Sequence, residues 1–327
     1  MYNRGMIELQ QCIDKEQWDE FVLENNGHPL QLWGWGQVKA SHGWSAERYM
    51  ALRDDAVVGG AQVLIRRLPF PFRSIAYIPR GISSDAEVLD AIALHVKKHH
   101  HVVAMTVEPN SREITLSSAW KKSSSTILSA ETMLVDTTKS ESDLLSDMAK
   151  KTRQYIRKSA AEGFTIRQVK TKEELDQCLV MYRQTAVRAK FNLHNDSYYH
   201  DVFQQMNDHS PIFAAFVDGA PIAFLWLAIS ADTAYELYGG VNESGQQLRA
   251  NYALKWHAIR KVKEWGISEY DFGGLVAGGV SNFKQGWSQD VVTFAGSYDR
   301  PLSPLYGIWR AVLPVGKKIS QTIKSIL

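Results

Sequence analysis

Apolar residues along the 327-residue chain follow strand and helix periods in an order that occurs twice. Aliphatic runs at residues 48–53 and 57–66 flank Asp54-Asp55, and runs at residues 212–217 and 221–229 flank Asp218-Gly219. Each pair predicts a β-hairpin, because turn residues separate two strand-forming runs. A strand, a helix and a closing strand follow each hairpin, first at residues 74–77, 87–99 and 102–107, then at residues 234–238, 249–265 and 270–272.

Helical sequence also opens each half, at residues 15–25 and 172–190. This order predicts an α/β (α+β) fold with helices on mixed sheets, and it resembles the GNAT acetyltransferase fold, present twice in tandem. We expect a first domain at residues 1–143, completed by residues 297–327, and a second domain at residues 144–296. The remaining patterns predict a glycine-rich loop at residues 273–282, a last strand at 294–297 and a helix at 305–326, broken at Pro314.

The composition is that of an ordinary globular protein, with 45% hydrophobic and 22% charged residues. The longest apolar stretch, residues 212–229, is interrupted by Asp218, Gly219 and Pro221, so no transmembrane helix is expected. The N-terminal sequence lacks the pattern of a signal peptide, and we therefore expect a cytoplasmic protein. Cys12 and Cys178 are the only cysteines and suggest neither a disulfide framework nor a thiolate metal site.

Short motifs spread over nearly the whole chain carry a more specific signal through their order and spacing. They are residues 31–39 (QLWGWGQVK), 77–81 (YIPRG), 108–109 (EP), 151–158 (KTRQYIRK), 238–240 (YGG), 251–256 (NYALKW), 270–274 (YDFGG) and 282–287 (NFKQGW). This set resembles the FemABX family of peptidoglycan interpeptide-bridge aminoacyltransferases, whose members carry two GNAT-like domains. Some members have a long coiled-coil arm in the second domain, but no heptad run predicts one here, so the chain is similar to the compact, FemX-like type.

The resemblance implies transfer of an amino acid from aminoacyl-tRNA to the stem-peptide amine of a peptidoglycan precursor. Lys284 is the expected fixed cation for the oxyanion, with Phe283 as a wall of the pocket. Glu108 is a candidate base for the attacking amine, because a lysine ammonium must lose a proton before it attacks. The alternative for Glu108 is a strand-end carboxylate that caps a loop, and the alternative for Lys284 alone would be a solvated surface lysine.

The acceptor precursor carries a diphosphate, which cations and hydroxyl groups would hold. The candidates are Lys39, Tyr77 and Arg80 in the first half and His194, Tyr198, Tyr238 and Tyr252 in the second. His194 stands where family members often have an arginine, so the headgroup could be held differently here or could be a different one. For each tyrosine, a buried ring with a satisfied hydroxyl group is the alternative.

A basic helix is expected around residues 147–160, with Leu145, Met148, Thr152 and Ile156 on one stripe. Its cations suit tRNA phosphates, although an ordinary solvated helix face would look the same, and they are Lys150, Lys151, Arg153, Arg157 and Lys158. The run Lys97-Lys98-His99-His100-His101 predicts no metal site, since carboxylate or cysteine ligands are not suitably spaced. We expect no metal and no cofactor.

Two other function classes remain open at this point. A GNAT acetyltransferase would use acyl-CoA, but the turn before the helix at residues 249–265 lacks the glycines that let backbone N–H groups reach a pyrophosphate. A non-catalytic module could bind tRNA or contact the inner face of a membrane through a basic C-terminal helix containing Trp309, Lys317, Lys318 and Lys324. The sequence does not name the transferred amino acid, the acceptor form, the general base or the oligomeric state.

Overall fold

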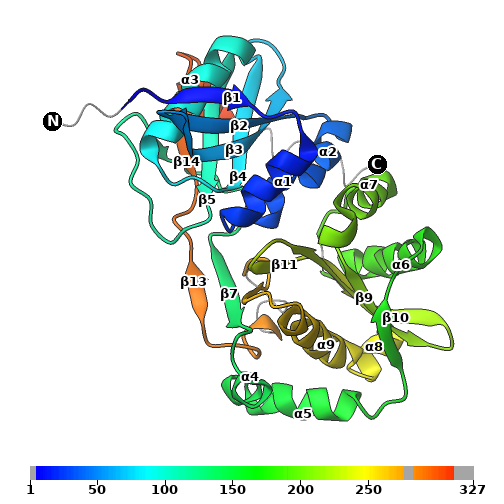
Figure 1. Ribbon diagram of the computed structural model, residues 1–327. Coiled ribbons are helices and arrows are strands. Elements are labelled where there is room, and N and C mark those ends of the chain that lie inside the picture. The colour runs from blue at the N-terminus through cyan, green and yellow to red at the C-terminus, as the bar shows by residue number, and fades with distance from the viewer. Residues whose placement is uncertain (1–4, 190, 276–282, 313–327) are drawn as a thin grey trace. The chain divides into compact units, whose positions relative to one another are not determined.

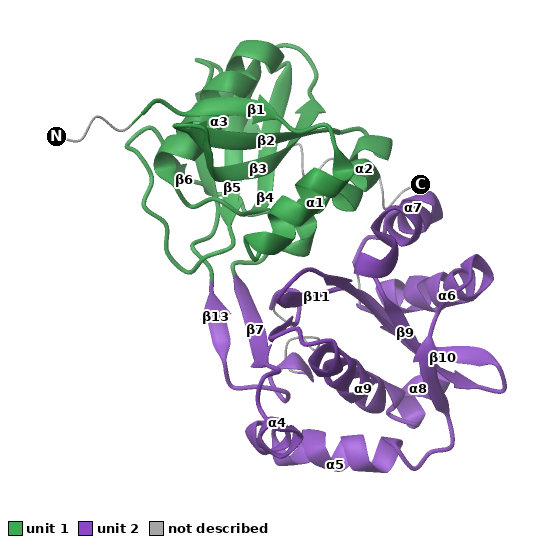
Figure 2. Cartoon of the chain, viewed as in Figure 1, with its two compact units in different colours: residues 1–130, 294–327 green, residues 131–293 purple. Residues whose placement is uncertain are grey.

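The computed structural model describes residues 5–189, 191–275 and 283–312, and it divides the chain into two compact units (Figure 1). Unit 1 contains residues 1–130 and 294–327, and unit 2 contains residues 131–293 (Figure 2). Each unit is built around one seven-stranded mixed sheet with helices packed against it. This arrangement confirms the predicted α/β fold class.

Unit 1 has the strand order β1-β2-β3-β4-β5-β14-β6. Its strands are β1 (Glu8–Gln11), β2 (Ser45–Arg53), β3 (Ala56–Arg67), β4 (Ser74–Gly81), β5 (Val102–Pro109), β6 (Lys121–Lys122) and β14 (Tyr298–Pro301). Its helices are α1 (Lys15–Glu24), the short η1 (Pro29–Gln31), α2 (Trp33–Ser41) and α3 (Ala86–His100). The amphipathic α3 connects the parallel strands β4 and β5, and its apolar face packs on the sheet through Val88, Ile92 and Val96.

Unit 2 has the strand order β13-β7-β12-β11-β10-β9-β8. Its strands are β7 (Glu131–Asp136), β8 (Thr165–Gln168), β9 (Ile212–Val217), β10 (Ala220–Ile229), β11 (Thr233–Val241), β12 (Glu269–Asp271) and β13 (Val291–Thr293). Its helices are α4 (Glu141–Asp147), α5 (Lys150–Ser159), α6 (Lys172–Ala189), α7 (Asp196–Met206), η2 (Asn207–His209), α8 (Glu243–Gln247) and α9 (Ala250–Glu264). Here α9 is the crossover between the parallel strands β11 and β12, as α3 is in unit 1.

The boundaries between the units follow the sheet pairing. Strand β7 pairs with β12 and with β13, so residues 131–143 and the chain up to residue 293 lie with unit 2. The sequence placed these boundaries at residues 143 and 296. It also predicted a strand at residues 294–297, which is wrong, because this segment connects β13 to β14 through Gly296, at φ +77°, and is part of neither strand.

Helix boundaries differ from the prediction at two places. The helix expected around residues 147–160 is two helices, because Met148 and Ala149 have extended backbone conformations between α4 and α5. Near the C-terminus residues 306–312 are helical, and the rest of the expected helix, with Lys317, Lys318 and Lys324, lies outside the described residues. Across the described ranges, no helix has both the length and the apolar character that a bilayer span requires.

Candidate functional site

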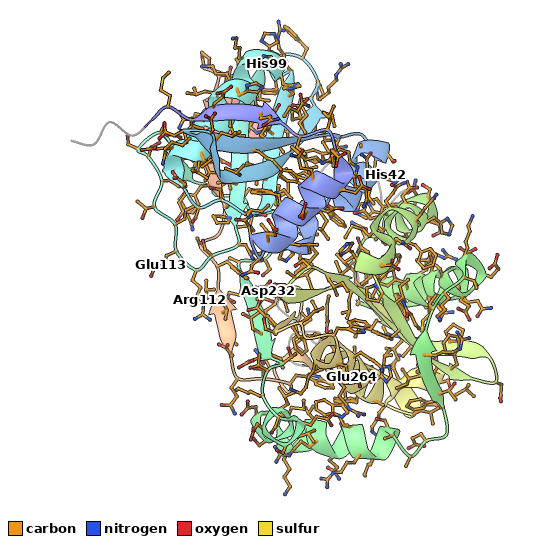
Figure 3. The ribbon with its side chains drawn as sticks, in the orientation of Figure 1. His42, His99, Arg112, Glu113, Asp232 and Glu264 are labelled. Carbon is orange, nitrogen blue, oxygen red and sulfur yellow. The ribbon has the colours of Figure 1, made fainter. Side chains whose placement is uncertain are left out.

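A pocket of about 470 Å³ lies in unit 2 at the end of strand β12. Strands β11 and β12 pair up to Tyr235 and Asp271, and the next residue of each segment, Glu236 and Phe272, lines the pocket. The pocket is lined by residues 236–241 of β11, whereas Asp232, labelled in Figure 3, belongs to the turn before this strand. Strand β10, helices α6, α8 and α9 and the segment at residues 283–284 supply further lining, so all of the site's residues come from unit 2.

Lys284 lines this pocket, where the sequence placed the fixed cation. Its Nζ donates hydrogen bonds to the carbonyl oxygens of Phe272 and, at 2.7 Å, of Gly274. Burial lowers the pKa of Lys284, and the carboxylates of Glu236 and Asp271 act in the opposite direction. Lysine carries three N–H donors, so two hold the amino group in place and the third can reach a ligand.

A second lysine, Lys255 on α9, lies in the same pocket. Its Nζ is 2.5 Å from Glu236 Oε1, and the two side chains are only 7% and 9% exposed. The Tyr270 hydroxyl donates to the same carboxylate oxygen at 2.6 Å. Burial lowers the pKa of Lys255 to about 8, although Glu236 raises it, and the charge of Lys284 lowers it further. The pocket therefore holds two interacting ammonium groups and one buried carboxylate.

The sequence did not single out Lys255 or Glu236 as functional. Lys255 does stand within the motif at residues 251–256, but its spacing on α9 resembles that of any inward-facing residue. Glu236 comes 19 positions earlier on a different element. The signal in the sequence was a charged residue at each of two positions where the pattern predicts burial. Burying a charge costs free energy unless it is paired, so two such residues indicate a buried ion pair.

The backbone after β12 is held close to the pocket floor. Gly273 has φ +74°, and a Cβ at this position would lie 2.3 Å from the carbonyl oxygen of Glu236. Its N–H donates to Asp271 Oδ1 at 2.8 Å, and the Thr132 hydroxyl also donates to this carboxylate oxygen. These bonds fix the Phe272 and Gly274 carbonyl groups that hold Lys284. Residues 276–282 of the predicted glycine-rich loop lie outside the described residues.

Aromatic rings form one wall of the pocket. Tyr238, a predicted binding residue, lines it together with Tyr182 and Phe224. The hydroxyl groups of Tyr238 and Tyr198 are hydrogen-bonded, and burial raises the pKa of Tyr198 to about 12. His194 is exposed and stacks on Tyr198, with their ring centroids 3.9 Å apart. The structure therefore brings three of the predicted acceptor residues into one cluster, of which only Tyr238 lines the pocket.

Phe283 lines the pocket as predicted, and its ring also contacts Tyr252, with centroids 5.0 Å apart. Tyr252 lies outside the pocket lining, between Phe283 and the Tyr155 ring of α5. The buried Trp287 stacks on Tyr252 at a centroid distance of 6.0 Å. These four rings link the pocket wall to the basic helix.

Helix α5 presents the predicted basic surface. Thr152 and Ile156 are buried, as the stripe predicted, while Lys150, Lys151, Arg157 and Lys158 are exposed. Arg153 is half-buried and donates to backbone carbonyl groups at the end of α4, so it supports the helix boundary instead. The Tyr155 ring lies beneath the Arg249 guanidinium group, 4.9 Å from its centroid.

The other predicted residues lie in unit 1. Glu108 is buried and accepts hydrogen bonds from the Tyr77 and Ser297 hydroxyl groups and from the N–H groups of Ile127 and Leu128. This is the loop-capping arrangement, the alternative to a base. The hydroxyl group of the buried Tyr77 ring is therefore satisfied by the Glu108 carboxylate. This is the alternative that the sequence analysis gave for Tyr77.

Lys39 and Arg80 complete the predicted set in unit 1. Burial lowers the pKa of Lys39 to about 8, with the charge of Arg66 as a second cause, and its Nζ lies 4.4 Å from the Trp35 ring centroid. Arg80 is buried, lies over the Phe294 ring at 3.9 Å and donates to the Ser129 carbonyl oxygen at 3.0 Å. Among the described residues, no three His, Cys, Asp or Glu side chains gather as a metal site.

Comparisons with known proteins agree with the fold. Residues 146–285 match the family model of the acetyltransferase (GNAT) domain. The chain is 25% identical over 274 residues to a lipid II:glycine glycyltransferase of Staphylococcus aureus, a match that covers 77% of this chain and 62% of that protein. The chain therefore spans less than two thirds of the length of this curated relative.

Two solved structures share the fold over most of the chain. The crystal structure of FemX superposes with a TM-score of 0.83 at 19% identity, covering 93% of this chain and 100% of that chain. The structure of L-PGS from Bacillus licheniformis has a TM-score of 0.57 at 15% identity, covering 96% and 97%. The chain is thus similar in sequence to a lipid II:glycine glycyltransferase and shares the fold of FemX, which supports the predicted FemABX resemblance and the two GNAT-like domains.

Proposed function

We propose that the chain is an aminoacyltransferase that moves an amino acid from aminoacyl-tRNA to the stem-peptide amine of a peptidoglycan precursor. The acceptor is UDP-MurNAc-pentapeptide or lipid II, and the product is an interpeptide bridge or its first residue. The observation that carries this proposal is the half-buried Lys284 ammonium group, held by two backbone carbonyl groups in a pocket with aromatic walls. The similarity to a lipid II:glycine glycyltransferase supports the choice of acceptor.

The reaction needs charge stabilisation more than bond activation, because the ester of aminoacyl-tRNA is already reactive. The acceptor amine attacks the ester carbonyl carbon, a C–N bond forms, and negative charge develops on the carbonyl oxygen. When the tetrahedral species collapses, the C–O bond breaks, and the ribose oxygen leaves with a proton that came from the amine. A fixed ammonium donor beside the carbonyl stabilises the oxyanion without reorganising during the step.

Lys284 fills this role because its third N–H can reach the oxyanion while two backbone carbonyl groups fix its position. Lys255 and Glu236 act behind it as positioning residues. Their pairing satisfies both buried charges beside Lys284 and adds no net charge, so the Lys284 ammonium group supplies the positive charge that favours an anionic transition state. Glu108 caps a loop through its hydrogen bonds and does not act as the base. The attacking amine therefore passes its proton to another group of the substrates or to solvent.

The tRNA donor belongs to this proposal through the exposed cations of α5. The helix that carries these cations is connected to the pocket wall by ring contacts, because Tyr155 of α5 packs on Tyr252 and Tyr252 packs on Phe283. Phosphate contacts of this kind position a nucleic acid without reading its sequence. We further propose that the protein acts in the cytoplasm and contacts the inner face of the membrane when its acceptor is lipid-linked.

An acyl-CoA transferase is the second candidate, and the GNAT domain match favours it. The start of α9 speaks against it, because Arg249 adopts a left-handed conformation with φ +54° where GNAT enzymes would use a glycine-rich turn. Ala250 is fully buried and Tyr252 packs against Tyr155 and Phe283, so side chains occupy the positions where close backbone approach would be needed.

The test is a transfer assay with a panel of charged tRNAs and with acetyl-CoA, against both acceptor forms, read by mass spectrometry of the product. We expect product only with an aminoacyl-tRNA and a muramyl-peptide acceptor. Turnover of an amine with acetyl-CoA alone would establish the acyl-CoA function instead.

A further inference from the structure

Three segments of unit 1 come together at one end of its sheet. The turn between β3 and β4 lies beside the end of α3, since the Ser74 hydroxyl donates to the His100 carbonyl oxygen at 2.6 Å. The segment after β14 joins them, because the Leu302 N–H donates to the Val103 carbonyl oxygen at 3.1 Å. A small apolar cluster beneath connects the segments, with Phe72 and Trp309 ring centroids 5.2 Å apart.

Large apolar side chains remain exposed above this cluster. Phe70, between two prolines at the tip of the β3–β4 turn, is 93% exposed, and Ile308 and Val312 are 57% and 45% exposed. Phe72 and Trp309 already fill the cluster, so the folding of unit 1 does not explain the exposed position of Phe70. We call Phe70, Ile308, Val312 and the cations named next the turn surface.

The turn surface is strongly positive. Residues 66–74, 97–101 and 302–312 contain no Asp or Glu, whereas the whole chain is nearly balanced, with 37 Lys and Arg against 35 Asp and Glu. Glu47 pairs with His100 at its margin. The cations of the turn surface are all exposed, and they are Arg66, Arg67, Arg73, Lys97, Lys98 and Arg310.

We propose that the turn surface docks unit 1 on an anionic lipid bilayer. Phe70 would insert among the headgroups and acyl chains, while the surrounding arginines and lysines contact lipid phosphates. Exposed phenylalanine and aliphatic side chains beside basic residues fit this interface, where apolar burial and charge attraction add together. An RNA backbone offers phosphates but no apolar layer for Phe70, Ile308 and Val312, which is why the membrane is favoured.

This inference rests on the proposed function in one respect, because the role of lipid binding would be to give the protein access to a lipid-linked acceptor. Lipid binding itself requires only the exposed apolar side chains and the cations of the turn surface. It also places the contact on residues of the β3–β4 turn and of α3, in addition to the basic C-terminal segment that the sequence suggested.

The test is co-sedimentation of the full chain with phosphatidylcholine vesicles, prepared with and without phosphatidylglycerol. We expect binding to the anionic vesicles only, weakened by salt. Phe70→Ser should reduce the binding constant by about tenfold, because one large apolar side chain is no longer buried. Arg67→Gln should reduce it by roughly fivefold. Circular dichroism should be unchanged for Phe70→Ser, since this side chain is exposed.

Val57→Ser is the matched control, because Val57 is 50% exposed beside the β2–β3 turn, at the other end of strand β3. It should bind vesicles as the unmodified chain does. Equal binding by Phe70→Ser and the unmodified chain would overturn the proposal, and so would an equal loss in Val57→Ser. A fall in bulk tRNA binding on Arg67→Gln, without any vesicle binding by the unmodified chain, would overturn the proposal and assign the turn surface to RNA. The vesicle assay involves no aminoacyl transfer, so its failure is distinguishable from failure of the proposed function.

Discussion

The buried pair of Lys255 and Glu236 makes the sharpest prediction about how the pocket is held together. Glu236→Gln keeps the shape of the side chain and removes its charge, which leaves the Lys255 ammonium group buried beside Lys284. Removing one partner of a buried ion pair costs about 3 to 5 kcal/mol. The lower end applies here, because Lys255 has a pKa of about 8 and can release its proton instead. We expect a loss of about 3 kcal/mol in the free energy of unfolding.

The double variant Glu236→Gln/Lys255→Met separates pairing from packing. Replacing both charges leaves no unpaired ion, so the double variant should be no less stable than either single variant. The coupling energy from the cycle should then be at least about 2 kcal/mol. Urea unfolding followed by circular dichroism measures all four proteins. Additivity of the single variants within about 0.5 kcal/mol would refute the account of the pair.

The pH dependence of stability gives a second readout of the same pair. The pKa of Lys255 is about 8 in the folded protein, below the ordinary lysine value of 10.5 that applies to the unfolded chain, so the unfolded chain binds more protons between these values. Stability contributed by this group therefore rises with pH, by about 1.6 kcal/mol between about pH 8 and pH 9.5. The stability of the unmodified chain relative to Lys255→Met should increase by this amount over that range. An unchanged difference would show that Lys255 titrates normally.

Three further changes test other parts of the account. Gly273→Ala should lower the free energy of unfolding by about 2 kcal/mol and the transfer rate by about tenfold, because the added Cβ would lie 2.3 Å from a backbone oxygen. Normal stability in urea would contradict this. Glu108→Gln should lower the melting temperature but leave kcat within about threefold, as expected for a loop cap, whereas a loss of about 100-fold would restore the base assignment. Lys151→Gln should reduce the slope of log K for tRNA binding against log salt concentration by about 0.7. Lys172→Gln, at an exposed position on α6, should leave this slope unchanged. Equal slopes for both variants would show that α5 is not part of the tRNA site.

The sequence predicted the tandem order of elements because each half repeats strong local signals. The hairpins at Asp54-Asp55 and Asp218-Gly219 and the crossover helices follow from period and turn chemistry alone. The segment at residues 294–297 was misassigned because Gly296 has φ +77°, which interrupts an extended strand, and its backbone hydrogen bonds go to separate partners, Ala130, Ser111 and Ser123. Whether an apolar segment pairs depends on neighbours that no local pattern specifies.

The site was predictable only in part, for the same reason. Lys284 and Phe283 were found through their motif, and the structure places both in one pocket. The Lys255 and Glu236 pair joins a residue of α9 to a residue of β11 that lies 19 positions earlier, and no local pattern specifies this contact. Glu108 illustrates the converse, since its place at a strand end suggested chemistry while its donors come from residues 127 and 128 and from Ser297.

The central claim is that the Lys284 ammonium group stabilises the oxyanion of aminoacyl transfer. The most direct measurement is single-turnover transfer from charged tRNA to a muramyl-peptide acceptor by the unmodified chain and by Lys284→Met, with Lys261→Met on the exposed face of α9 as the matched control. Loss of one such donor costs about 100-fold to 1,000-fold in rate, so Lys284→Met should lose at least that much while still binding acceptor, and Lys261→Met should transfer normally. Full transfer by Lys284→Met would contradict the claim.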